Sequence, residues 1–443
     1  MNRHIFRHAL ANTLIASVVN FTVWFAVTFF VYLETRSVFA TGVIAGIFLA
    51  FTALSGVWFG SLVDHHAKRT VMIGSSAASL AAYAAAFGVY LLAGPEPFRD
   101  PASPVLWAFV LLLMVGVIVG NLRGIAMSTV VTLLIDEDGR DRANGLVGTA
   151  SGVSFLITSV ISGLLVGLAG MYYVLVLAVV ASAAAIGHLT RLRFPNDNPA
   201  PADGERRRVD LRGTVALVAG VPGLVALIAF STINNFLGGV FMALMDPYGL
   251  SLVSVETWGL LWGVLSTGFI VGGLVISRRG LGSRPLRSLL LANLILWMIT
   301  SVFAVRSSIL LLAVGMYLYL CLVPFVEAAE QTVLQKVVPF ERQGRVFGFA
   351  QSVEQAASPL TAFLISPIAQ FVVIPFMTTG SGAEWIGPWF GVGPDRGLAL
   401  VFTVTGVIGL AVTLYALGSR AYRQLSAHYR TAPITRRELA PAA

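Results

Sequence analysis

Long stretches without any charged residue constrain this chain more than any other feature of its sequence. Residues 9–33, 37–63 and 70–94 contain no Asp, Glu, Lys or Arg. A helix needs ~20 residues, with a rise of about 1.5 Å each, to cross the apolar part of a bilayer. Only 11% of all residues are charged, whereas a soluble domain carries roughly 25%. The sequence therefore predicts a membrane protein with several spanning helices and excludes a water-exposed globular domain.

Apolar runs separated by charged residues predict twelve spanning helices, so we expect an all-α membrane protein. The nine later spans are expected at 104–135, 143–170, 171–190, 213–245, 257–277, 288–305, 307–335, 346–376 and 397–419. The longest connection, 193–212, is rich in Pro, Asp, Asn and Arg and predicts a cytoplasmic linker. It divides a six-helix bundle at 1–192 from a second one at 213–420, and a cytoplasmic tail follows at 421–443.

The distribution of Lys and Arg predicts the orientation in the membrane. Of the 29 Lys and Arg residues, 24 fall in the two tails and alternate connections, 4 fall in the other connections, and Arg123 lies within a span. Positive residues remain on the cytoplasmic side, so we expect both termini in the cytoplasm and the protein in the cell inner (plasma) membrane. The net charge of +8 is then a signal of topology, and nucleic-acid binding is the poorer explanation.

The two predicted bundles resemble each other weakly. At an offset of 203 residues, Arg142 and Gly145 align with Arg345 and Gly348. At an offset of 214 residues, Asn20 aligns with Asn234. Parallel repeats of this kind indicate a transporter with its site between the halves, near the middle of the bilayer.

The stretch "GSLVDHHAKRT", residues 60–70, interrupts two charge-free runs in a predicted cytoplasmic turn. Gly60 lets a neighbouring helix approach closely. Asp64, one turn later, can accept hydrogen bonds from the free N–H groups at the start of another helix. Lys68 and Arg69 would anchor the turn at the lipid headgroups. We expect this cluster to hold the inner ends of the two halves together; the alternative is an ordinary short basic loop.

Three motifs resemble a known family. "GSLVDHHAKRTVM" is similar to the signature loop of the major facilitator superfamily, while "RANGLVGTASG" and "QKVVPFERQGRVFG" resemble the macrolide-efflux-like branch of drug:proton antiporters. The resemblance covers the whole chain and implies the major facilitator fold, with twelve helices in two six-helix pseudo-repeats. It also implies that the glycine, the acid and the basic pair of the first motif act as a conformational gate.

We include the repeated arginines, Arg142 and Arg345, in this predicted gate. The corresponding loop after the eighth span has Ser277 where a repeat of the first motif would place an acid.

Ionisable groups within the spans are candidates for the site, because each costs at least ~2.5 kcal/mol in a membrane. They are Arg123 in span four, Glu327 and Glu330 on one face of span ten, and Glu354 in span eleven. We expect the three glutamates to line the C-terminal half of a central cavity, where at least one carries a coupling proton. Arg123 would be their positive partner from the other half; the alternative is a fixed Arg–Glu network that ties spans together.

Asn20, Asn234 and Asn235 are polar groups in apolar helices, and either substrate binding or helix–helix adhesion explains them. The adjacent histidines His65 and His66 lack further ligands nearby, so we expect a loop role and no metal or other cofactor.

These features favour a transporter over other classes. The sequence has no G-x-x-x-x-G-K-[ST] motif of an ATP-driven pump and no catalytic constellation of an enzyme. Our main hypothesis is a monomeric antiporter for proton-coupled efflux of amphiphilic or cationic drugs by alternating access, as in multidrug resistance. Its partners would be a small amphiphilic substrate, protons and the lipid bilayer, but no nucleic acid. The alternatives are an exporter of one endogenous metabolite, such as a siderophore or a lipid, and a membrane sensor that does not transport.

Overall fold

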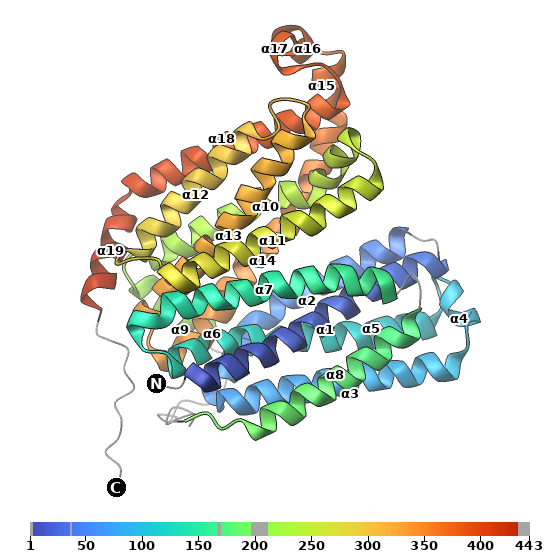
Figure 1. The fold of residues 1–443 in the computed structure, drawn as a ribbon, viewed down its shortest axis with the longest axis vertical. Helices are drawn as coiled ribbons and strands as arrows, with labels where there is room; N and C mark the ends of the chain where they lie inside the picture. The colour runs from blue at the N-terminus through green and yellow to red at the C-terminus, as the bar shows by residue number, and fades with distance from the viewer. Residues whose placement is uncertain (1–2, 36–37, 166–169, 196–210, 433–443) are drawn as a thin grey trace.

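Long helices in two adjacent groups make up the computed structural model, which describes residues 3–35, 38–165, 170–195 and 211–432 (Figure 1). The N-terminal half consists of α1 (Arg3–Thr35), α2 (Val38–His65), α3 (Lys68–Ala93), α4 (Glu96–Arg99), α5 (Pro104–Gly120), α6 (Leu122–Leu134), η1 (Glu137–Gly139), α7 (Arg140–Leu164) and α8 (Met171–Arg191). The C-terminal half contains α9 (Leu211–Gly220), α10 (Leu224–Leu252), α11 (Val255–Arg279), α12 (Pro285–Val302), α13 (Ile309–Val337), η3 (Phe340–Arg342), α14 (Gln343–Ile368), η4 (Ala369–Val373), α15 (Ile374–Thr378), α16 (Ser381–Trp385), α17 (Gly387–Phe390), α18 (Pro394–Gly418) and α19 (Arg420–Thr431).

The predicted spans correspond to helices of this structure. Ten helical segments of the described residues are long and apolar enough to cross a membrane, and α5 with α6 count as one of them. The 28-residue α2 and the 25-residue α7 take the places of the second and fifth predicted spans. The all-α fold with two six-helix halves is therefore confirmed.

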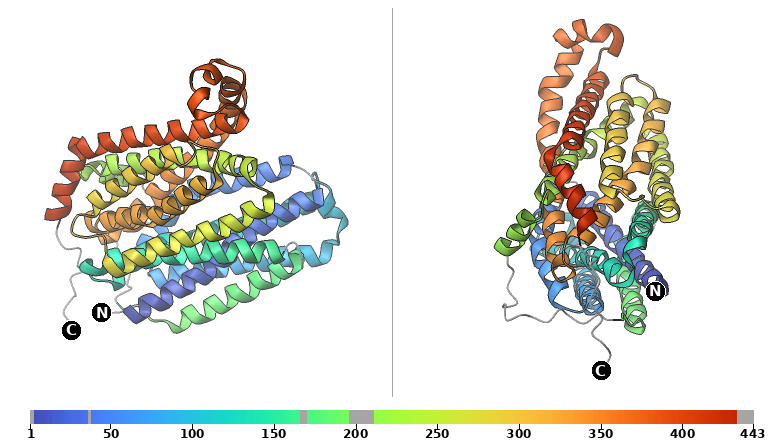
Figure 2. Two further views of the ribbon diagram at one scale, coloured as in Figure 1. Left: turned by 45° about the horizontal axis from the view of Figure 1, so that its top comes forward. Right: turned by 90° about the vertical axis from the view of Figure 1, so that its left-hand side faces the viewer.

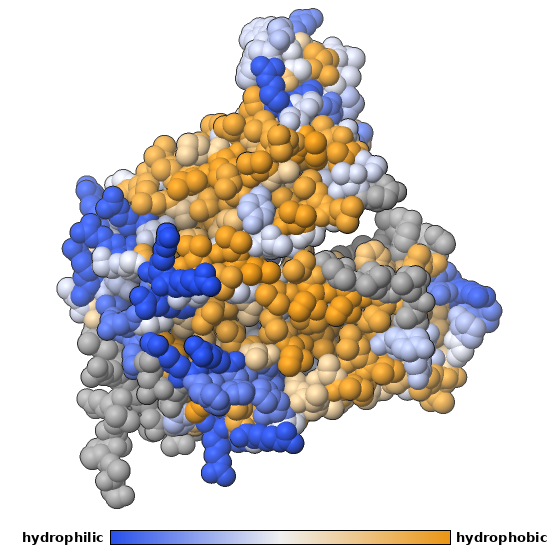
Figure 3. Space-filling model, in the orientation of Figure 1, coloured by the Kyte–Doolittle hydropathy of each residue, from blue (hydrophilic) through white to orange (hydrophobic). Residues whose placement is uncertain are grey.

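The larger hydrophilic surface lies at the end where α1 begins and α19 lies, and a smaller one lies at the opposite end of the N-terminal half (Figures 1 and 3). We call the first of these the inner end, which the distribution of Lys and Arg predicts to be cytoplasmic, and the opposite end the outer end. On the face seen in Figure 3, an apolar surface lies between the two ends. This is the surface expected of a protein surrounded by lipid.

The seventh span begins later than its apolar run predicts. The run was expected to form one helix at 213–245, but α9 ends at Gly220 and α10 begins at Leu224. Pro222 and Gly223 separate them, and Gly223 has a φ of 83°, which a residue with a side chain rarely adopts. Helix α9 is therefore a short separate helix at the inner end; residues 196–210 of the predicted linker lie outside the described residues.

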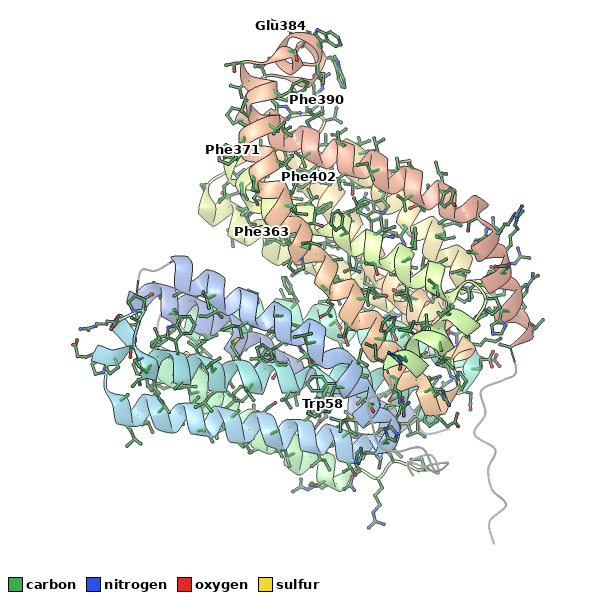
Figure 4. The ribbon with its side chains drawn as sticks, turned by 180° about the vertical axis from the view of Figure 1, so that it is seen from behind. Trp58, Phe363, Phe371, Glu384, Phe390 and Phe402 are labelled. Carbon is green, nitrogen blue, oxygen red and sulfur yellow. The ribbon has the colours of Figure 1, made fainter. Side chains whose placement is uncertain are left out.

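Span eleven is also interrupted. A π-helical segment, η4, joins α14 to α15, and the chain then forms α16 and α17 beyond the outer end, as Figure 2 shows. Glu384 lies in this projecting knob (Figure 4), and Trp385 within it is 82% exposed.

Among the described residues, the halves pack together from the inner end to the middle of the helices, where Gly152 of α7 meets Phe269 of α11. One hydrophobic cluster joins the N-terminal half to inner parts of the C-terminal half, including Ile276, Ala328 and Phe347. The outer part of the C-terminal half has a separate cluster around Tyr248 and Phe402. At the outer end the surface is hollowed between the halves (Figure 3). The structure is thus closed at the inner end and open at the outer end.

Candidate functional site

Two membrane-embedded glutamates lie together in the C-terminal half. Glu330 of α13 is 9% exposed, and its Oε1 accepts a hydrogen bond of 2.6 Å from the hydroxyl of Ser231 on α10. The carboxyl group of Glu354 on α14 lies near that of Glu330, close enough for the two groups to interact electrostatically. Its Oε1 is buried and has no hydrogen-bond partner. Neighbouring carboxyl groups repel each other when both are ionised, so a pair placed like this suits the uptake and release of H⁺.

The third glutamate, Glu327, faces the space between the halves. One turn before it, Pro324 contacts Gly148 of α7 and Gly272 of α11. Residues three apart on a helix differ in direction by about 60°, so Glu327 points between the direction of Pro324 and that of Glu330. Its side chain is exposed, and its charge is close enough to that of Glu330 to repel it. The three acids therefore extend from the α10–α13–α14 contact towards α7 of the other half.

Arg123 does not meet these acids in this structure. Arg123 is 3% exposed, and its guanidinium group donates to Asn12 of α1 and Ser76 of α3, both in the N-terminal half, while its Nε has no partner. Among the described residues, no Lys, Arg or His nitrogen lies within 4.0 Å of the three carboxylates. The expected Arg–Glu pair across the halves is therefore absent, because position 123 faces α1 and α3.

The asparagines hold helices together. Asn20 of α1 accepts a hydrogen bond of 2.8 Å from Tyr83 on α3, and Asn234 of α10 accepts one of 2.6 Å from Trp297 on α12. Donor and acceptor are 63 residues apart in both pairs, so the same contact recurs in each half and supports the offset of 214. Asn235 differs, because its side chain donates to the carbonyl oxygen of Ser231 on its own helix, and only its backbone carbonyl oxygen accepts from Ser358 of α14.

The predicted gate lies where α2 meets α14 at the inner end. A Cβ atom on Gly60 would lie 2.2 Å from the carbonyl oxygen of Gly344, so only glycine allows this approach. The carboxylate of Asp64 accepts hydrogen bonds of 2.6 and 2.9 Å from the backbone N–H groups of Gly344 and Arg345. Asp64 thus accepts hydrogen bonds from the free N–H groups in the first turn of α14, which is the geometry expected from the sequence.

Arg345 strengthens this contact through two side chains of α2. Its Nε lies 3.7 Å from the carboxylate of Asp64, and its Nη2 lies 2.9 Å from Nε2 of His65. The other ring nitrogen of His65 lies 2.8 Å from the carbonyl oxygen of Ser61 and must donate to it. Nε2 of His65 therefore accepts from Arg345 in this arrangement, a role that the sequence did not indicate.

The basic pair of the motif holds the turn itself. The ammonium group of Lys68 donates to the carbonyl oxygen of Val63 at 2.7 Å and lies 5.3 Å from the ring centre of Phe340 in η3. Arg69 donates to the carbonyl oxygens of Leu189 and Thr190 at the end of α8, within its own half.

A second contact between the halves joins α7 to α11. A Cβ atom on Gly145 would lie 2.7 Å from Ile276 and 2.8 Å from the backbone nitrogen of Ser277. In this contact the acid lies on α7 and not on α11, the helix that precedes the corresponding loop. Asp141 at the start of α7 accepts a hydrogen bond of 2.8 Å from the N–H of Leu281. Ser277, the position that lacks the expected acid, bonds only a carbonyl oxygen of its own helix.

Arg142 and its neighbour Arg140 differ in surroundings. Arg142 is exposed, whereas Arg140 is 3% exposed and donates to the carbonyl oxygen of Gln335 on α13. Arg142 was predicted to belong to the gate, whereas Arg140 was counted only as a topology charge, and no local signal in the sequence separates them.

Further contacts across the halves involve neutral residues that the sequence analysis did not select. Gln335 and Asn144 of α7 exchange hydrogen bonds of 2.9 and 3.2 Å, and Gln335 also donates to the carbonyl oxygen of Ser128. Beside them, Lys336 forms a 2.6 Å ion pair with Glu137 of η1. The sequence signal for this contact was that Asn144 and Gln335 are polar residues near the ends of predicted spans. No group of three or more His, Cys, Asp or Glu in the described part of the chain is arranged to hold a metal ion.

Comparisons with known proteins agree on the family. A family model described as Major Facilitator Superfamily matches residues 10–362. The solved human organic anion transporter MFSD10 (TETRAN) is similar, with a TM-score of 0.69 and 12% identity over 92% of this chain and 99% of that one. A bacterial homologue of the iron transporter ferroportin in an outward-facing state is also similar, with a TM-score of 0.68 and 15% identity. The match covers 94% of this chain and 100% of that one.

The proton:xylose symporter XylE, bound to 6-bromo-6-deoxy-D-glucose, gives a TM-score of 0.65 and 13% identity over 97% of this chain and 100% of that one. At such identities the likeness concerns the fold alone. No curated protein matches the sequence. Because the family model covers most of the chain and the fold agrees with it, this protein belongs to the major facilitator superfamily of membrane transporters.

Proposed function

We propose that this transporter exports amphiphilic, cationic compounds in exchange for protons. The observation that carries the proposal is the Glu330–Glu354 pair, whose carboxyl groups lie together in the membrane without a basic partner among the described residues. When the pair is ionised it attracts a cation. When it gains a proton it releases the bound cation. Glu327 extends the acidic surface into the space between the halves.

The exchange follows from the two orientations of the cavity. In the outward-open form described here, H⁺ from outside reaches the pair and a bound cation leaves. In an inward-open form, H⁺ leaves to the cytoplasm and a new cation binds. One positive charge then replaces another at the same carboxylates, so neither reorientation leaves the acids without a counter-charge.

The three structural relatives transport chemically different compounds by their names, so they do not identify the substrate. The acids argue against an anion, since like charges repel. The macrolide-efflux-like motifs in α7 and before α14 favour efflux of a bulky amphiphile.

Proteoliposomes with an imposed pH gradient test the proposal, with ethidium as the cationic probe and a trapped pH dye. Wild-type protein should move ethidium against H⁺, and Glu330→Gln or Glu354→Gln should reduce this flux at least ~10-fold, which corresponds to roughly 1.4 kcal/mol. Glu327→Gln should weaken ethidium binding more than proton movement. Glu384→Gln, in the exposed knob, is the matched control.

Full gradient-driven flux in all three site variants would refute the assignment. Failure of a broad panel of cations, with transport of one endogenous compound, would favour the single-metabolite exporter. No flux of any compound would favour a sensor.

A further inference from the structure

A second cavity lies away from the space between the halves. A groove of about 670 Å³ opens at the inner end between α10, α12, α18 and α19, all in the C-terminal half. Ala226, Phe230, Leu290 and Val412 are among the apolar residues that line it. None of the glutamates discussed above contributes to it, so the proposed proton exchange does not account for this groove.

The position of the groove places it at the level of the lipid headgroups. Helix α18 ends at Gly418, and the hydroxyl of Ser419 caps the start of α19 at Tyr422. The groove therefore begins where a spanning helix leaves the membrane and continues along α10 and α18 into the apolar layer. Tyr415 on its wall is 80% exposed, as is typical of tyrosine at a membrane interface. Its apolar wall faces acyl chains.

Two arginines stand at the polar side of the groove. Arg420 and Arg423 of α19 both line it and both are exposed. Among the described residues, no carboxylate lies within 4.0 Å of either guanidinium group. Helix α19 carries a third arginine, Arg430, and no acid. Guanidinium groups bind phosphate through paired N–H donors, and basic residues at the cytoplasmic surface attract anionic lipids.

We propose that this groove binds one anionic phospholipid of the inner leaflet. Its phosphate would lie between Arg420 and Arg423, and one acyl chain would follow the apolar wall formed by Phe230, Leu290 and Val412. A soluble phosphate compound would leave this wall uncovered, and a protein partner would have to enter the apolar layer. The proposal does not depend on the transported substrate.

Native mass spectrometry of the full-length protein tests it. Delipidated protein is mixed with equal amounts of palmitoyl-oleoyl-phosphatidylglycerol and palmitoyl-oleoyl-phosphatidylcholine. The first bound lipid should be phosphatidylglycerol. Arg420→Gln and Arg423→Gln should each lower its affinity about fivefold, and together about 25-fold, with phosphatidylcholine binding unchanged. Arg430→Gln, on the same helix but outside the groove, should match the wild type.

Two further measurements distinguish the binding of a whole lipid from the binding of a soluble phosphate compound. Excess glycerol phosphate should not displace the lipid, and Ala226→Phe, which fills the apolar wall, should weaken both lipids equally. The proposal fails if the wild type retains both lipids equally, if Arg430→Gln acts like the double variant, or if glycerol phosphate displaces the lipid. If the double variant does not fold, the single variants decide the matter by the same criteria.

Discussion

Adding a single methyl group at Gly60 should open the inner end. The Cβ atom of Gly60→Ala would lie 2.2 Å from the carbonyl oxygen of Gly344 and 2.8 Å from the Cα atom of Arg345. Both are backbone atoms, so no side-chain rotation relieves the clash. Helices α2 and α14 would have to separate by about 1.2 Å to reach the 3.4 Å of an ordinary contact. Overpacking of this kind costs about 1–3 kcal/mol, which shifts a two-state equilibrium by about 5- to 150-fold.

The shift should favour the inward-open form, where α2 and α14 separate and the methyl group has room. Electron spin resonance distances measure it, with labels at Asp138→Cys and Arg342→Cys, two exposed positions on opposite halves of the inner end. The native thiol is first removed by Cys321→Ser. The label distance should lengthen in Gly60→Ala.

Gly74→Ala is the matched control, because its Cβ atom would meet nothing within 4 Å. Thermal unfolding of both variants shows whether the protein is folded. The reasoning is refuted if Gly60→Ala retains the wild-type distances while folded, or if Gly74→Ala shifts them equally.

Three other changes follow from the contacts described. Asp64→Asn directs an amide donor at backbone N–H groups, so it should weaken the inner contact by about 1–3 kcal/mol and lengthen the same label distance; an unchanged distance contradicts this. Asn20→Ala and Asn234→Ala each remove a half-buried acceptor and should lower stability by about 1–3 kcal/mol, seen in thermal unfolding, with ethidium flux per folded protein retained; lost flux at full stability would instead indicate a substrate role. Lys336→Met removes the ion pair with Glu137 and should favour the inward-open form by about 1 kcal/mol, with the distance distribution again as the measurement; no shift would show that neutral contacts suffice.

Membrane helices were predictable because each must satisfy its own backbone hydrogen bonds within the bilayer. Apolar length alone therefore locates spans, while their interruptions depend on local detail. The Pro222–Gly223 break within the predicted seventh span was visible in the sequence, yet the apolar run continued across it. The π-helical segment η4 lies between Pro367 and Pro375, which indicate a disturbed helix but do not specify a π-helical turn.

The candidate site was partly predictable for a different reason. Charged groups in hydrocarbon are costly, so Glu330 and Glu354 were recognisable as individual residues. That they lie together, and that Ser231 donates to Glu330, depends on the relative positions of α10, α13 and α14. Arg123 shows the same limit, because its depth in the membrane was predictable and the face of its helix was not.

The central claim is that the acid pair exchanges a proton for a cation, and proton release on binding tests it most directly. Ethidium is added to purified protein in a weakly buffered detergent solution that contains a pH dye. The account predicts that wild-type protein releases protons in proportion to the ethidium bound, and that Glu330→Gln/Glu354→Gln releases none. Binding without proton release in the wild type, or equal release in the double variant, would contradict it.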